Sequence, residues 1–188
     1  ILTTETLSLL DQIVDKDLPF LRTIYGDFSY FGLKGRNHYL CIGRAGANHE
    51  IVKRVRARLE GTKGERRDVE AILGYRLDDE EWFEISGDTD FCAQNRCNPE
   101  ACYATAARDI AANADIVVTS HTMLQIHGEF IQQGAEGGLL GDFSHIIVDE
   151  AHSLEKVVVD GSTLEVAPWE LYQKINTISK GVEDADTR

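Results

Sequence analysis

The stretch Ser144-His145-Ile146-Ile147-Val148-Asp149-Glu150-Ala151-His152 joins a short apolar run to two consecutive carboxylates. A continuous apolar run of this length is typical of a strand that is buried in a parallel sheet. In open α/β sheets, ligands bind beyond the carboxyl ends of the strands, where Asp149 and Glu150 fall. The sequence therefore predicts an α/β fold with a functional carboxylate pair at the end of this strand.

This carboxylate pair suits a nucleotide–magnesium complex. Magnesium prefers oxygen ligands and is usually held by one or two carboxylates together with phosphates. We predict that Asp149 contributes to the magnesium shell and that Glu150 positions and deprotonates an attacking water. We expect His152 to relay the nucleotide state to neighbouring segments. The alternative is an ordinary strand end with solvated acids.

Patterns upstream extend the α/β prediction. Asp115-Ile116-Val117-Val118-Thr119 is a second apolar run, which favours a second buried strand. Apolar residues recur at helical spacing over residues 7–14 and predict a helix, which we expect Pro19 to end. The glycine-rich residues 134–141 lack the Gly-Lys-Ser/Thr ending of a phosphate loop and precede a strand, so we interpret them as a surface connection.

The chain has four cysteines and no secretory signal pattern, which makes disulfides the weaker interpretation: Cys41, Cys92, Cys97 and Cys102. Asn98 and Pro99 are typical of a helix start, so a helix is predicted from Pro99 to about residue 113. The start of a helix favours thiolates through its dipole and free N–H groups.

Four thiolates can hold either zinc or an iron–sulfur cluster. Zinc sites usually use two closely spaced cysteine pairs, whereas here one cysteine stands apart from a group of three. The spacing therefore favours an iron–sulfur cluster. Zinc, and cysteines with no metal at all, remain the alternatives.

Charge is unevenly distributed along the chain. The net charge of −13 argues against a simple DNA-coating protein, but residues 51–67 are strongly basic. Ile51, Val55 and Leu59 recur at helical spacing, and this places the basic residues on the solvent side: Lys53, Arg54, Arg56 and Arg58. Such a face could guide single-stranded DNA, with Lys34 and Arg36 adding charge. The alternative is a solvated helix neutralised by the acidic residues 78–81.

Four segments, in order, resemble the XPD/DinG family of iron–sulfur superfamily 2 DNA helicases, particularly its DinG-like branch. Thr3-Thr4-Glu5-Thr6 is similar to motif Ia, and residues 31–41 resemble the segment that leads into the first cluster ligand. Cys102-Tyr103 and residues 114–124 resemble the segment that leaves the last ligand. Residues 147–154 match motif II, the DEAH box.

The resemblance implies a RecA-like parallel-sheet motor domain, in residues 1–31 and 105–155, with an inserted, mainly helical cluster domain in residues 32–104. Residues 156–188 would begin an arch-type insertion. It also implies a 4Fe-4S cluster on all four cysteines, and ATP and Mg²⁺ in the intact parent. The DNA contacts that we predict are Thr4, Lys34, Arg36, Tyr39, Arg54, Arg56 and Arg58.

The implied activity is ATP-driven 5′-to-3′ translocation on single-stranded DNA with unwinding of forked duplex, in a cytoplasmic, nucleoid-associated enzyme. The expected partners are DNA and the remaining helicase domains of the parent, and no apolar run approaches the roughly 20 residues of a membrane span. The chain opens on Ile1 without an initiator Met, so we expect it to be part of something longer.

The chain departs from the family pattern in lacking both a Gly-x-x-x-x-Gly-Lys-Ser/Thr loop and the arginine-finger motifs. We therefore expect this chain alone to be inactive. A non-enzymatic four-cysteine zinc module and a degenerate helicase scaffold are alternative interpretations. We expect His121 and His127 to have loop and helix-surface roles, with metal ligation as the alternative. We expect Trp82 and Trp169 to be packing residues, with base stacking as the alternative.

Overall fold

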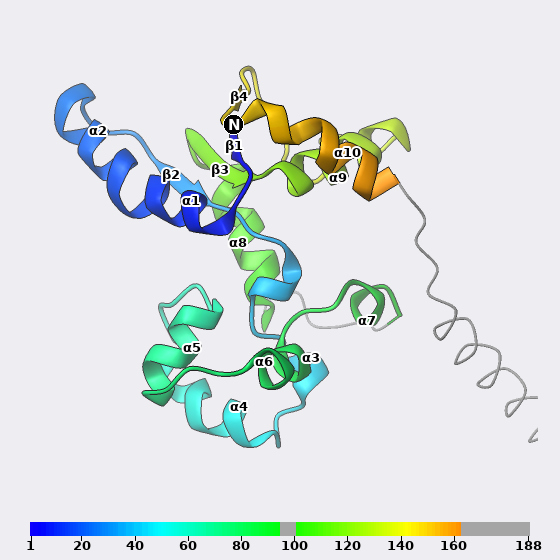
Figure 1. Cartoon of the computed structure of the whole chain (residues 1–188). Helices are drawn as coiled ribbons and strands as arrows, with labels where there is room; N and C mark the ends of the chain where they lie inside the picture. The colour runs from blue at the N-terminus through cyan, green and yellow to red at the C-terminus, as the bar shows by residue number, and fades with distance from the viewer. Residues whose placement is uncertain (95–100, 163–188) are drawn as a thin grey trace, which may run out of the picture.

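The computed structural model describes residues 1–94 and 101–162. Four strands form one parallel sheet in the order β2-β3-β1-β4 (Figure 1): β1 (Leu2–Thr4), β2 (Tyr30–Gly32), β3 (Ile116–Ser120) and β4 (Ile147–Val148). In this register Thr3 lies opposite both Thr119 and Val148. The predicted α/β class with parallel strands is confirmed, and β3 is buried as expected. The prediction that residues 145–148 form a buried strand was wrong, since β4 lies at the edge of the sheet and Ile147 is 62% exposed.

One face of the sheet is covered by a single helical rod. It comprises α1 (Leu7–Gln12), the π-helical turn η1 (Ile13–Asp17) and α2 (Leu18–Tyr25). The Thr6 side chain caps α1 by accepting a hydrogen bond from the Leu9 N–H at 3.2 Å. Buried residues of the rod pack on Val118 of β3: Leu10, Ile13, Val14 and Leu18.

Pro19 does not end this rod, so that prediction was wrong. Proline has no N–H and clashes with the carbonyl four residues earlier, which usually breaks a helix. Here the wider turn η1 precedes it, and the Leu18 N–H bonds to the carbonyl of Ile13, five residues back. Pro19 then falls in the first turn of α2, where a missing N–H costs little.

The opposite face of the sheet carries α8 (Tyr103–Ala112) and α9 (His121–Gln132). Val117 points to this face because successive strand residues alternate sides, and it packs among Ala104, Ala107, Ala111 and Met123. After β4 the chain forms η5 (Ala151–Ser153) and α10 (Leu154–Ser162), which lies along α9 (Figure 1).

Two sequence predictions concern helix starts near the ends of the described ranges. The helix predicted from Pro99 begins at Tyr103 in the described residues, with Cys102 as its N-cap instead of a first-turn residue. Cys97 and the predicted cap Asn98 lie outside the described residues, as does the helix expected near Pro168.

Residues between β2 and α8 form a helical insert with a core of its own, shown beneath the sheet in Figure 1. Its elements are η2 (Arg36–His38), α3 (Ile42–Ala45), α4 (Glu50–Val55), η3 (Arg56–Arg58), α5 (Arg66–Leu73), α6 (Asp79–Ile85) and α7 (Thr89–Gln94). Trp82 is buried in this core, as predicted. Within the described residues, no helix is both long and apolar enough to cross a membrane.

Candidate functional site

Three neighbouring strands of the sheet end at one edge, and the DEAH residues lie there. The order β3-β1-β4 with parallel pairing brings the carboxyl ends of all three together. The Asp149 N–H donates to the carbonyl of Thr3 at 2.9 Å, which extends the β1–β4 pairing one residue beyond β4. Asp149 and Glu150 are therefore exposed beyond the carboxyl end of a parallel strand, where nucleotides bind in such folds.

Glu150 has an unusual backbone. Its φ of 51° is left-handed, and among the described residues it is the only non-glycine residue with a positive φ. The turn is held by the N–H and the hydroxyl of Ser153, which both donate to the Glu150 carbonyl at 2.9 Å. Such conformations cost about 1–3 kcal/mol and cluster at functional sites.

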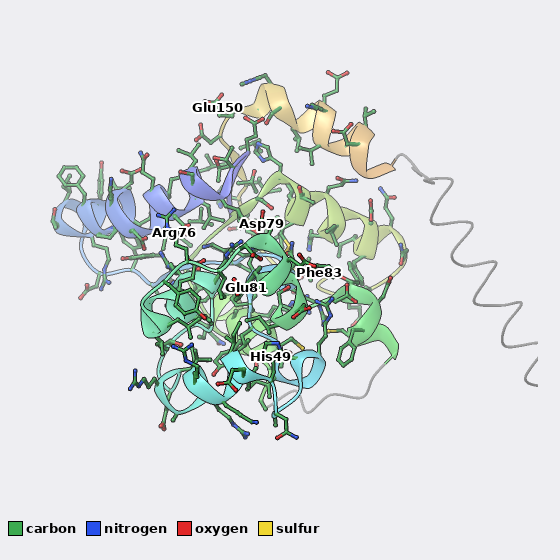
Figure 2. The ribbon with its side chains drawn as sticks, turned by 60° about the horizontal axis from the view of Figure 1, so that its bottom comes forward. His49, Arg76, Asp79, Glu81, Phe83 and Glu150 are labelled. Atoms are coloured by element: carbon green, nitrogen blue, oxygen red, sulfur yellow. The ribbon has the colours of Figure 1, made fainter. Side chains whose placement is uncertain are left out.

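The Glu150 side chain extends away from the protein body. Figure 2 shows it at the outer edge, by the start of α10, apart from the labelled insert residues Arg76 and Phe83. Its Oε2 atom lies 3.3 Å from Nδ1 of His152, and both side chains are at least half exposed. The geometry thus leaves the carboxylate open to a ligand, with His152 as its neighbour.

Two buried polar side chains lie at the same edge. His121 is 1% exposed, and its Nδ1 lies 3.0 Å from Oγ1 of Thr3. Its Nε2 has no hydrogen-bond partner within the described part of the chain, and neither does Oγ1 of the fully buried Thr4. The DNA contact that we predicted for Thr4 thus falls on an interior side chain.

The loop and helix-surface roles expected for His121 and His127 were wrong, since both lie in α9 and both side chains are buried. His127 accepts hydrogen bonds at Nδ1 from the N–H groups of Leu139 and Leu140, each at 3.2 Å. Burial lowers its pKa below the usual value. The sequence did contain a signal for the position of His121. Ser120 ends the apolar run and is a good helix cap, so the residue after it begins a helix at the end of the strand.

The described cysteines come from three elements of the insert and its exit. Cys41 caps α3, with Sγ accepting from the Arg44 N–H at 3.4 Å, Cys92 lies in α7, and Cys102 caps α8. The Cys41 N–H donates to the carbonyl of Ile85 at 2.8 Å. This pairing brings the chain entering Cys41 beside the chain that leads into α7.

The described residues do not by themselves form a metal site. Within residues 1–94 and 101–162, no group of three or more His, Cys, Asp or Glu side chains could hold a metal ion. Arg108 of α8 is within electrostatic reach of the Cys102 and Cys92 thiols, and burial, followed by the charge of Arg36, lowers its pKa. Arg108 therefore contributes a positive charge near two of the thiols that a metal or cluster would use.

Comparison with known proteins finds relatives that align with the whole chain. No family model matches the chain. It is 27% identical over 220 residues to the ATP-dependent helicase DinG of Mycobacterium tuberculosis, an alignment that covers 100% of this chain and 32% of that protein. This chain is a relative of the DinG-like helicases. The predicted resemblance is confirmed.

Further DinG-like relatives align in the same way. The ATP-dependent DNA helicase DinG of Photobacterium profundum is 27% identical over 214 residues, covering 99% of this chain and 30% of that protein. The ATP-dependent DNA helicase YoaA of Escherichia coli is 26% identical over 171 residues, an alignment that covers 84% of this chain and 26% of that protein. The chain therefore spans about a third or less of each relative.

Like Thr4, the predicted DNA contacts Lys34 and Tyr39 are interior residues. Lys34 is 8% exposed, and its Nζ lies 2.7 Å from carboxylate oxygens of both Asp11 and Glu65. Tyr39 is 1% exposed, its hydroxyl accepts from the Lys34 N–H at 3.1 Å, and burial raises its pKa to about 12. The expected cationic face therefore does not include Lys34, because two carboxylates already neutralise its charge.

The basic residues of the predicted helical segment 51–59 do form a solvent-facing set. Ile51, Val55 and Leu59 are buried, as predicted. We call the four exposed side chains of the same segment the basic face: Lys53, Arg54, Arg56 and Arg58. Arg36, the other predicted contact, is only half-buried.

The acidic residues 78–81 do not neutralise the basic face. Asp78 and Glu81 form the capping box of α6, and Asp79 pairs with Arg66 at 2.8 Å. No ion pair within the described residues joins a residue of the basic face to a carboxylate. The alternative of a neutralised helix is therefore not what the structure shows.

Proposed function

We propose that this chain is part of a DinG-like, ATP-dependent DNA helicase and carries a portion of its motor together with the insert. The observation that carries the proposal is the position of Asp149 and Glu150 at the carboxyl edge of a parallel sheet. The whole chain also aligns with proteins named as ATP-dependent helicases.

In this proposal each DEAH residue has one task. Asp149 helps to hold a magnesium ion, which supplies positive charge at the nucleotide phosphates. Glu150 accepts a proton from the attacking water, and its exposed carboxylate leaves room for that water. His152, 3.3 Å from Glu150, orients the carboxylate. The lysine of a phosphate loop, which this sequence lacks, is expected from another part of the parent.

We also propose that the four cysteines hold a 4Fe-4S cluster. The donor chemistry fits, because the chain supplies four thiols and Arg108 is near two of them. One cysteine apart from three is also unlike the paired spacing of most zinc sites. Ligation by Cys41, Cys92 and Cys102 would tie α3, α7 and the start of α8 together.

We propose further that the basic face guides single-stranded DNA along the insert. Its arginines are exposed and no described carboxylate pairs with them, so they are available to phosphates. Arg56 is within electrostatic reach of Tyr103, the residue that follows Cys102. The charge of the basic face thus extends towards the cysteine end of α8. A 5′-to-3′ direction of movement is proposed from the family resemblance.

The test is DNA-stimulated ATP hydrolysis and unwinding of forked duplex by the full-length parent. Glu150→Gln should retain ATP binding and lower turnover by about 100-fold or more, since the general base is lost. Glu155→Gln, at an exposed position on α10, is the matched control and should be near wild type. Residues 1–188 alone should not hydrolyse ATP. An absence of DNA stimulation in the parent would refute the proposal.

A further inference from the structure

Thr3 joins two segments that meet at the DEAH edge. Its carbonyl accepts the Asp149 N–H at 2.9 Å, and its Oγ1 lies 3.0 Å from Nδ1 of His121. Thr3 is fully buried in the middle of β1, and His121 and Asp149 directly follow the two strands that flank β1. A continuous polar connection therefore runs from the side chain of the first residue of α9, through Thr3, to the backbone N–H of the first DEAH residue.

The hydrogen bonding of His121 is incomplete. The ring is 1% exposed, yet no described group partners Nε2. Leaving a buried polar atom unpaired costs about 1–3 kcal/mol, so an imidazole kept in this position needs a reason. His127, on the same helix, shows the ordinary case, in which two N–H groups bond to its buried Nδ1.

We propose that His121 is a positioning residue for the magnesium–nucleotide site and acts on Asp149 through Thr3. This inference rests on the proposed ATPase function and deepens it. The imidazole holds Thr3 in place, and Thr3 in turn holds the backbone of Asp149. Magnesium demands near-ideal geometry from its oxygen ligands, so a small shift of β1 weakens its binding. The unpaired Nε2 gains its hydrogen bond when the nucleotide-bound form of this edge is assembled.

The experiment uses the full-length parent and measures the Mg²⁺ concentration that gives half-maximal equilibrium binding of a fluorescent ATP analogue. His121→Ala and Thr3→Val should each raise this concentration by about tenfold, as is typical when groups that orient metal ligands are lost. The double variant should need no higher a Mg²⁺ concentration than either single variant, because both changes break the same connection. His121→Asn should recover most of the loss, since its amide reaches the position of Nδ1.

His127→Ala is the matched control, because it removes a buried histidine of the same helix with no link to Thr3. It should lower the thermal midpoint without changing the Mg²⁺ requirement. The proposal would be overturned if the effects of the single variants on the Mg²⁺ requirement were additive, or if His121→Asn needed as much Mg²⁺ as His121→Ala. A His121→Ala variant with a lower midpoint of thermal unfolding but an unchanged Mg²⁺ requirement would also overturn it. A wild-type parent that binds no Mg²⁺–ATP would refute the proposed function itself.

Discussion

Nζ of Lys34 lies 2.7 Å from Oε2 of Glu65, and both side chains are buried. Lys34 follows β2 of the sheet, whereas Glu65 caps α5 of the insert. The same ammonium group lies 2.7 Å from Asp11 of α1, and Arg67 of α5 pairs with Asp15 at 2.8 Å. A network of charges therefore fixes the insert to the helical rod of residues 7–25.

Lys34→Met should destabilise the protein, because the buried Glu65 carboxylate would keep only Arg67, 3.3 Å away, as its counter-charge. The loss should be smaller than the roughly 3–5 kcal/mol expected when a buried charge is left with no partner at all. The measurement is denaturant unfolding, monitored by the fluorescence of the buried Trp82. Adding Glu65→Gln should recover part of the loss. As a control, breaking the exposed Arg22–Asp27 pair with Arg22→Ala should barely change the unfolding midpoint. A Lys34→Met variant as stable as wild type would contradict the buried network.

Replacing Arg54, Arg56 and Arg58 with Ala should weaken binding of single-stranded DNA by the parent helicase. Each lost phosphate contact should flatten the dependence of log affinity on log salt by up to about one unit. The variant should keep its fold, because all three side chains are exposed. Arg76→Ala, an exposed arginine outside the basic face, is the control. An unchanged salt slope in the triple variant would place the DNA elsewhere.

Cys97→Ser should abolish the visible iron–sulfur absorption of anaerobically prepared protein, because a four-thiolate cluster loses one of its ligands. Iron and zinc analysis of the same sample distinguishes the two metal proposals. Iron with labile sulfide supports the cluster. Stoichiometric zinc without iron would instead support the four-cysteine zinc module.

The stability of the protein should fall below about pH 6.5, partly through His127. Burial lowers the pKa of this imidazole from its usual 6.5, so the unfolded chain binds the proton first as the pH falls. The contribution of His127 to stability is complete above the pKa of the imidazole in the unfolded chain. It is lost as the pH falls through the lower pKa of the folded protein. His38 acts in the same direction, since burial also lowers its pKa.

The contribution of His127 is isolated by comparing the unfolding free energy of wild type and His127→Gln between about pH 5 and pH 8. The difference between the two proteins should shrink at low pH, because the wild type loses its neutral imidazole acceptor there. A difference that does not vary with pH would show that protonation of His127 is not linked to folding.

Local patterns were sufficient to predict β3, β4 and the buried stripe of α4. The run at residues 115–119 overlaps β3, and the run at residues 145–148 contains β4. β4 is shorter than predicted, since it lies at the sheet edge and pairs only with β1. Burial of Ile51, Val55 and Leu59 followed from helical spacing alone. The DEAH carboxylates were placed correctly because strand ends in parallel sheets share one edge.

Features that depend on distant partners were not predictable. Lys34 looked like surface charge because its partners Asp11 and Glu65 are 23 and 31 positions away and meet it only in the fold. The buried position of His121 was missed because its partner Thr3 lies 118 positions away. Pro19 was predicted to end the helix because the sequence pattern does not indicate the π-helical turn that precedes it.

The placement of the insert between β2 and β3 has a thermodynamic consequence. These strands are adjacent and parallel, so the insert and α8 together form the crossover that every such strand pair requires. Lengthening a crossover from about 12 residues to about 80 is fewer than three doublings, each costing only about 0.6 kcal/mol of loop-closure entropy. An element with its own core can therefore be lengthened, shortened or exchanged at this junction with little penalty to the sheet. The rate of folding is more sensitive, because β2 and β3 can pair only after this long loop has closed.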